Sequence, residues 1–341
     1  MTNLLAPQFR PTLRSCALLF AILLPLPALA ENWQLKAGAQ NHNMAHQALA
    51  FLPNEIWIHQ NDTITWTFPT NEVHTVTFLQ PTQIRPSRLN GCPGLPPPGA
   101  TPDFSVYDGS TTCVNSGLLL NSSALPSPPT YSVVFPVIGN FKLVCLAHPN
   151  MTASIHVMDP STPLPHDQDF YDREGDRQRD ELLSDAMINV HNHHHSDHVT
   201  AGMGHIVGNA GGNQTVSVDR FMEDTKVIHV AETVEWTTDE AVTSHTITFG
   251  VEPPLATQTL PSANVTIDAD GARHAIISSP SDNVHSGFIT QLPQDRIGLP
   301  QVPLSGSATR FRVTFTAPGV YPYICVLHDD FGMVGKVIVL K

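Results

Sequence analysis

The sequence predicts an all-β protein made of two antiparallel β-sandwich domains, joined by a histidine-rich, partly helical linker. Three observations support this prediction: an internal repeat, short alternating apolar runs between turn residues, and a composition with 30 prolines and only 14% charged residues. Such a composition argues against coiled coils, helical bundles and disordered acidic tails. The length of 341 residues suggests about two domains.

The N-terminal residues 1–30 are expected to be a secretory signal peptide. Arg10 and Arg14 form its charged region, residues 16–26 are an apolar run, and residues 28–30 (Ala-Leu-Ala) give a small-x-small cleavage site. The run is too short to span a bilayer, and no later segment reaches the required length. We therefore expect an exported protein, periplasmic or secreted, with no transmembrane segment in the mature chain.

The internal repeat aligns residues 51–66 with residues 221–236 without gaps. Five of the 16 positions are identical: Phe51/Phe221, Ile58/Ile228, His59/His229, Thr63/Thr233 and Trp66/Trp236. Each copy continues with a histidine that opens a strand-like run, at residues 74–78 and 245–249. Short runs of this kind, separated by Pro, Gly, Asn and Asp, are typical of a β-sandwich. The copies therefore predict domains at 31–158 and 199–341.

A different segment, residues 159–198, separates the copies and is expected to be a linker. It holds ten acidic residues, and its six histidines are His166, His191, His193, His194, His195 and His198. Residues 169–189 are expected to form a helix with Leu182, Leu183, Ala186 and Met187 on one side. The histidine tract could gather metal, as histidine-rich tracts do, or could be a solvated spacer. We favour the spacer because the tract lacks a rigid scaffold.

The strongest chemical signal is a pair of matched loops that each begin at a cysteine. Cys145 is followed by a histidine after three residues and a methionine after six, and Cys325 by a histidine after three and a methionine after eight. One thiolate, two imidazoles and a weak thioether form the ligand set of blue-copper sites. Each loop supplies three of these donors, so the fourth must come from a distant strand, where His74 and His245 occupy matched positions. The alternative is a pair of buried structural cysteines.

The second copy resembles plastocyanin and pseudoazurin, whose loops have the pattern Cys-x2-His-x4-Met. The first resembles amicyanin, whose shorter loop is Cys-x2-His-x2-Met. The resemblance to these cupredoxins covers most of residues 31–158 and 199–341, and it implies Greek-key β-sandwiches with one type 1 copper each. The ligands that it implies are His74, Cys145, His148 and Met151 in the first domain and His245, Cys325, His328 and Met333 in the second.

The sequence departs from the cupredoxin pattern directly after the first histidine ligand. Many cupredoxins have Asn at this position, whereas this chain has Thr75 and Thr246. The backbone amide that typically bonds the cysteine sulfur would survive this change. The side-chain contacts that stiffen the site are in doubt.

Two further cysteines, Cys92 and Cys113, lie in an irregular stretch rich in Pro and Gly, residues 79–130. In an exported protein they are expected to form a disulfide, which would close a loop of about twenty residues. The alternative is a second metal site, but neither cysteine has a nearby histidine or methionine.

We expect an electron carrier rather than an enzyme. Two-domain copper oxidases and nitrite reductases relay electrons from the type 1 cysteine through an adjoining histidine. Here the neighbours of the two cysteines are Val144, Leu146, Ile324 and Val326. Copper storage or delivery is the main alternative to electron transfer.

The charge of the chain favours a basic partner and excludes nucleic acid, which needs a basic face. The chain has 30 acidic and 17 basic residues. Loss of Arg10 and Arg14 with the signal peptide leaves 15 basic residues and a net charge of −15. A redox partner protein with a positive docking surface, such as a basic cytochrome, would be attracted to this mature chain.

Overall fold

The computed structural model describes residues 30–81, 83, 104–109, 113–192, 197–240, 242–291 and 308–341. The expected all-β class is confirmed, since β-strands dominate these residues and one α-helix accompanies them. The expected signal peptide falls almost wholly outside the described residues, as do Cys92 and His193 to His195. Among the described residues, no helix combines the length and the apolar character needed to cross a membrane.

The first half of the chain forms ten strands in the described residues. These are β1 (Asn32–Gln40), β2 (His46–Leu52), β3 (Glu55–His59), β4 (Thr63–Thr67), β5 (Thr77–Phe78), β6 (Phe104–Val106), β7 (Val114–Asn115), β8 (Thr130–Val134), β9 (Gly139–Val144) and β10 (Thr152–Met158). A five-stranded sheet, β3-β10-β9-β5-β7, packs against β2-β1-β4-β8-β6 to form a sandwich. Buried and half-buried residues alternate along β3 and β4, which is the pattern of strands with one face in a core.

The second half repeats this plan. Its strands are β11 (Val199–Gly208), β12 (Asn213–Met222), β13 (Thr225–His229), β14 (Thr233–Asp239), β15 (Thr248–Phe249), β16 (Thr266–Ile267), β17 (Arg273–Ile277), β18 (Val284–His285), β19 (Arg310–Phe315), β20 (Gly319–Ile324) and β21 (Val334–Leu340). The sheet β13-β21-β20-β15-β18 covers the other side of its core. The repeated tryptophans, Trp66 and Trp236, are both fully buried, one in each core.

The sheets are mixed, which corrects the expectation of purely antiparallel sandwiches. In each half, three strand pairs run parallel: β1 with β4, β3 with β10 and β6 with β8, then β11 with β14, β13 with β21 and β17 with β19. Only strands joined by a hairpin must be antiparallel. After the β1–β2 hairpin the chain crosses to the opposite sheet as β3 and returns as β4, so β4 can lie beside β1 in the same direction.

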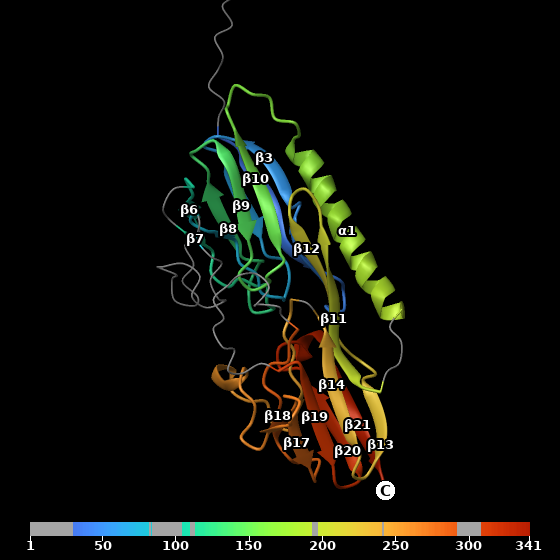
Figure 1. Cartoon of the computed structure of the whole chain (residues 1–341). Helices are drawn as coiled ribbons and strands as arrows, with labels where there is room; N and C mark the ends of the chain where they lie inside the picture. Colours follow the sequence, from blue (N-terminus) through green and yellow to red (C-terminus); the bar gives the residue numbers. More distant parts are fainter. Residues whose placement is uncertain are drawn as a thin grey trace, which may run out of the picture.

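A single sheet of eleven strands runs through both halves, because β12 pairs with β2 in antiparallel register. In this register Val216 lies opposite Ala48 and Thr215 opposite Leu49. Figure 1 shows the two sandwiches end to end, with β11 and β12 reaching from the second toward the first. The repeat had predicted two separate domains and contained no sign of this pairing.

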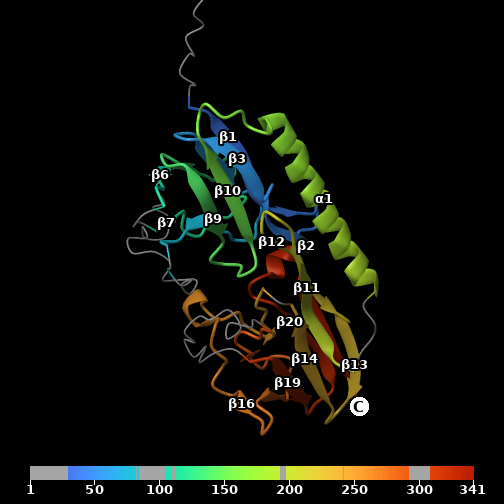
Figure 2. The ribbon, with the colours of Figure 1, turned by 45° about the horizontal axis from the view of Figure 1, so that its top comes forward.

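The helix α1 (Gln168–Asn192) confirms the expected linker helix and packs along the shared sheet (Figures 1 and 2). The Asp167 carboxylate caps its start by accepting a hydrogen bond from the backbone amide of Phe170. One stripe of the helix faces β1, β2 and β12, and its buried members are Tyr171, Gly175, Gln178, Leu182 and Ala186. The helix is therefore a brace between the halves. The interpretation of the histidine tract as a solvated spacer stays a prediction, because His193 to His195 lie outside the described residues.

The apolar side of the helix is narrower than the sequence pattern indicated. Leu182 and Ala186 are buried in a cluster with Ala48 and Ala50 of the first half and Val216 of the second. Met187, which was expected on the same side, is 48% exposed. Leu183 packs partly against the same cluster, so Met187 is the member of the expected apolar side that lies outside it.

Candidate metal centres

The first group of expected ligands comes together in the core of the first half. His74, Cys145 and His148 each offer one donor atom, and these atoms all lie within 4.8 Å of one another. His74 precedes β5, Cys145 directly follows β9, and His148 lies in the loop that leads to β10. All three side chains are buried. The sulfur of Cys145 lies 3.7 Å from Nδ1 of His148.

The second half contains the matching group, His245, Cys325 and His328. Here the sulfur of Cys325 lies 3.4 Å from Nδ1 of His328 and 3.9 Å from Nδ1 of His245. The two Nδ1 atoms are 3.2 Å apart. The loop that carries His328 includes a 3-10 turn, η3 (Asp329–Phe331), at the end of the second half that faces the first (Figure 2).

These groups have the dimensions of metal sites. A metal bonded tetrahedrally to one thiolate and one imidazole holds its sulfur and nitrogen about 3.5 Å apart, close to the separations seen in both groups. Two buried imidazoles also lack hydrogen-bond partners: both ring nitrogens of His74, and Nε2 of His245. Because unpartnered buried polar atoms are costly, a bound ion would explain part of this arrangement.

The two expected methionines close the loops that carry the cysteines. Met151 and Met333 are fully buried and belong to the same core clusters as Cys145 and Cys325. The backbone carbonyl of Met151 accepts a hydrogen bond from the amide of Cys145 at 2.9 Å, and that of Met333 accepts from Cys325 at 3.1 Å. Each thioether is therefore anchored at the base of the loop that holds the thiol and one imidazole.

The threonines after the first histidines preserve the contacts that were in doubt. The Thr75 amide donates to the Cys145 sulfur at 3.3 Å, and the Thr246 amide donates to the Cys325 sulfur at 3.4 Å. The threonine hydroxyls accept from the backbone amides of Leu146 and Val326, the residues after the cysteines, at 2.8 and 2.9 Å. A threonine thus ties the histidine strand to the cysteine loop in both halves.

Comparison with known proteins identifies the family of the second half. Residues 219–340 match the model for copper binding proteins of the plastocyanin/azurin family. This segment is a cupredoxin domain. It contains all four residues predicted as ligands in the second half: His245, Cys325, His328 and Met333.

Solved structures that match include a plastocyanin, a purple cupredoxin and a copper-containing nitrite reductase, whereas no curated protein gives a match. Oxidised plastocyanin from Dryopteris crassirhizoma is 18% identical, with 42% of this chain and 98% of that chain covered at a TM-score of 0.21. A purple cupredoxin from Nitrosopumilus maritimus is 22% identical, with 42% and 100% covered at 0.21. A copper-containing nitrite reductase from Thermus scotoductus is 13% identical, with 91% and 68% covered at 0.21.

Two glycines next to His74 and His245 were missed by sequence reasoning. Gly38 and Gly202 lie at matched β-bulges of β1 and β11, with φ of +83° and +72°. A Cβ atom at Gly38 would overlap Nε2 of His74, and one at Gly202 would overlap Nε2 of His245. The bulges therefore let the backbone close over the two histidines. Their sequences, Ala-Gly-Ala and Ala-Gly-Met, carry no visible metal motif.

The charges around the first site favour an ionised sulfur. Burial raises the pKa of the Cys145 thiol, but the hydrogen bond with His148 and the nearby His74 imidazole outweigh it and hold that pKa well below its ordinary value. For His148, burial lowers the pKa, while hydrogen bonds with Cys145 and Glu72 raise it to about 9. Thiolate is the form of cysteine that binds metal.

A buried carboxylate cluster at the junction of the two halves was also missed. Glu72, Asp219 and His328 bring donor atoms within 4.8 Å of one another. Burial disfavours ionisation of Glu72, but the hydrogen bond with His148 and the nearby histidines hold its pKa at about 2. Burial raises the pKa of Asp219 well above its ordinary value and that of Glu240 to about 8. Glu72 is thus ionised at neutral pH.

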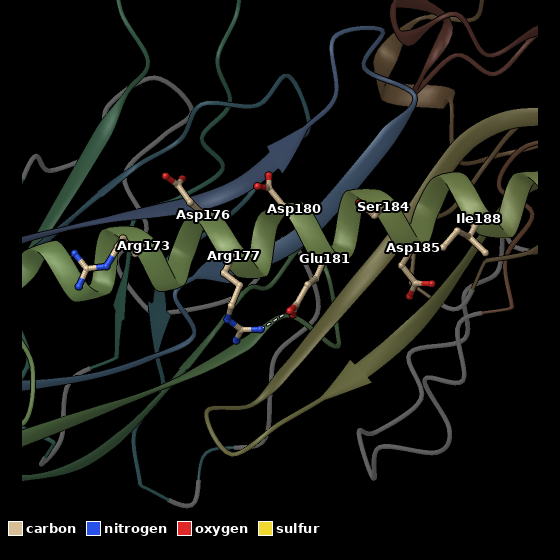
Figure 3. Close-up of a pocket in the computed structure, with 8 residues that line it drawn as sticks. All are labelled: Arg173, Asp176, Arg177, Asp180, Glu181, Ser184, Asp185 and Ile188. Carbon is tan, nitrogen blue, oxygen red and sulfur yellow. Dashed lines mark hydrogen bonds and ion pairs between the residues drawn. The ribbon is translucent and has the colours of Figure 1, made fainter.

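The remaining candidates lie apart from the metal groups. Cys113 is buried, but Cys92 is outside the described residues, so their disulfide stays a prediction. The outer face of α1 forms an open, charged groove that contains none of the expected ligands (Figure 3). Arg177 pairs there with Glu181, one turn further along the helix.

Proposed function

We propose that this is an exported blue-copper protein that binds one type 1 copper in each half and acts in electron transfer. One observation carries the proposal: each half buries a cysteine and two histidines within metal-binding reach, next to a buried methionine, and gives the cysteine sulfur a backbone amide. The first half would then be a second cupredoxin domain. Export follows from the expected signal peptide.

Copper bound in such a site supplies one-electron redox chemistry, tuned by the axial thioether and by hydrogen bonds to the sulfur. The chain contributes rigidity. Its donors come from a strand end and a short loop, and Thr75 and Thr246 join these two parts through their hydroxyls. Donors held in this way favour both oxidation states in nearly one geometry, as electron transfer requires.

The proposal assigns no enzymatic reaction. The residues that flank the two cysteines are aliphatic, so neither cysteine has an adjoining histidine through which a catalytic copper could be reached. Copper storage or delivery would use the same donors, and the two roles differ in how fast the metal leaves.

The test compares electron exchange with metal exchange in the mature, copper-loaded protein. Stopped-flow mixing with a basic cytochrome should show copper oxidation or reduction, and a competing copper chelator should remove little metal on that time scale. Metal lost to the chelator before any electron is exchanged would contradict the electron-transfer role and support delivery.

A further inference from the structure

We propose that Glu72 is a positioning residue shared by both candidate copper sites, which holds the outer edges of His148 and His328 with its two carboxylate oxygens. This inference rests on the proposed function, because it concerns two histidines that would ligate copper. It adds a residue from the first half that acts on the site of the second.

Glu72 lies between the two sites because of where the chain enters the first one. It precedes His74 by two residues, in the segment between β4 and β5. It is 8% exposed, and its carbonyl accepts a hydrogen bond from the Thr70 hydroxyl at 2.9 Å. A buried carboxylate of this kind needs partners for both oxygens.

The two oxygens face the two sites. Oε1 of Glu72 lies 3.0 Å from Nε2 of His148, a hydrogen-bond distance. Oε2 lies 3.7 Å from Nε2 of His328, within ion-pair range. The rings of His148 and His328 are almost completely buried, and the two contacts place Glu72 between their Nε2 atoms.

A carboxylate at Nε2 determines which ring nitrogen can bind metal. A neutral imidazole carries one proton, and a carboxylate at Nε2 keeps the proton there, which leaves the Nδ1 lone pair available. In both rings Nδ1 is the nitrogen beside the cysteine sulfur, at 3.7 Å in His148 and 3.4 Å in His328. The hydrogen bond from Glu72 therefore holds His148 in the tautomer that a metal needs, and the charge of the same carboxylate, 3.7 Å from Nε2 of His328, favours that tautomer in the second ring.

The second half offers no equivalent carboxylate at this position. Alignment of His74 with His245 places Thr243 opposite Glu72, and the Thr243 hydroxyl is buried without a hydrogen-bond partner. The repeat is thus asymmetric at the point where the halves meet. His328 therefore has a carboxylate from the first half, Glu72, beside it, in addition to Asp219 of the second half.

The test uses Glu72→Gln, which keeps the shape of the side chain and removes its charge. Each site is followed alone, in Cys325→Ser for the first and Cys145→Ser for the second, by titration with Cu(II) and with Zn(II). We expect affinity to fall 10- to 100-fold at both sites, the usual effect of losing a carboxylate behind a metal-bound histidine. Glu55→Gln is the matched control, because it removes a similar pair, with His156 at 3.1 Å, away from the sites.

A spectroscopic measurement on the wild-type protein tests the proposal even if Glu72→Gln does not fold. In the Zn(II)-loaded wild-type protein, ¹⁵N-histidine NMR should show protonated Nε2 and unprotonated Nδ1 in both His148 and His328. In Glu72→Gln these Nε2 proton resonances should shift. An Nδ1 proton on either ring of the wild-type protein would overturn the proposal.

The outcomes separate this inference from the proposed function. If the wild-type protein takes up no copper, the proposed function is wrong. The Zn(II) spectra would still test whether Glu72 positions both His148 and His328. Normal copper uptake with an unchanged affinity at either site of Glu72→Gln would overturn the shared role alone. A third equivalent of metal that disappears in Glu72→Gln would make Glu72 a ligand beside Asp219, and would also overturn it.

Discussion

Replacement of Gly38 by alanine should remove copper from the first site and leave the second intact. Gly38 has φ of +83°, and its backbone closes over the ring of His74. A methyl carbon there would lie 2.7 Å from Cδ2 of His74, whereas ordinary contact begins at 3.4 Å, so the ring must retreat by at least 0.7 Å. Metal–ligand distances tolerate only about 0.2 Å, so the displaced imidazole cannot complete the site.

The assay must separate this displacement from the cost of the left-handed backbone. An alanine in that conformation loses roughly 1–2 kcal/mol of folding free energy wherever it stands. Gly271→Ala is the matched control: its φ is +84°, and a Cβ atom there meets nothing within 4 Å. Both variants should show the backbone loss in denaturant unfolding, and Gly38→Ala should lose further stability through its overlap with His74. Only Gly38→Ala should lose copper.

Copper per chain, measured by metal analysis and thiolate absorption, should fall from two to one in Gly38→Ala. Gly202→Ala should have the mirror effect, because its methyl carbon would lie 2.7 Å from Cδ2 of His245. Two coppers retained in Gly38→Ala, or copper lost equally in Gly271→Ala, would refute the argument that the glycine backbone positions the histidine.

Three further predictions concern the brace, the buried acids and the partner. Leu182 lies in the cluster shared by both halves, so Leu182→Ala should lower the free energy of unfolding by about 2–5 kcal/mol. Ile188 is 56% exposed on the same helix, so Ile188→Ala should lower it by almost nothing. Equal losses in the two variants would contradict the bracing role. Burial raises the pKa of Glu240 to about 8 from an ordinary 4.5, so its contribution to stability is complete below pH 4.5 and is lost as the pH rises through about 8. The free energy of unfolding, measured across this pH range, should fall in the wild type and not in Glu240→Gln. A similar fall in both proteins would contradict the raised pKa of Glu240. Electron exchange with a basic cytochrome should slow as salt rises, and a rate independent of salt would leave the net charge without a role in docking.

The donor residues could be predicted from sequence because they are close in the chain or fall at repeated positions. Cys145 and His148 lie three residues apart, as do Cys325 and His328. His74 is far from them in sequence, but its equivalence with His245 pointed to a strand beside the cysteine loop. The structure places each of these histidines with its cysteine.

The residues that support the metal-binding side chains, Gly38 and Glu72, could not be predicted because they contact these side chains only through long-range packing. Gly38 supports His74 only because β1 bulges where it passes the ring, and Glu72 reaches His328 only because the two halves meet there. That meeting depends on the pairing of β2 with β12. Strand pairing between domains leaves no repeat or spacing in the sequence, since it depends on which sheet edges remain open.

The central claim is that each half of the chain holds its own copper. Copper titration of the mature protein, followed by visible absorption, tests it most directly when wild type, Cys145→Ser and Cys325→Ser are compared. The account predicts two coppers in the wild type, one in each variant, and the loss of a different thiolate-to-copper band in each. A single copper in the wild type, or a variant that loses both bands, would contradict it.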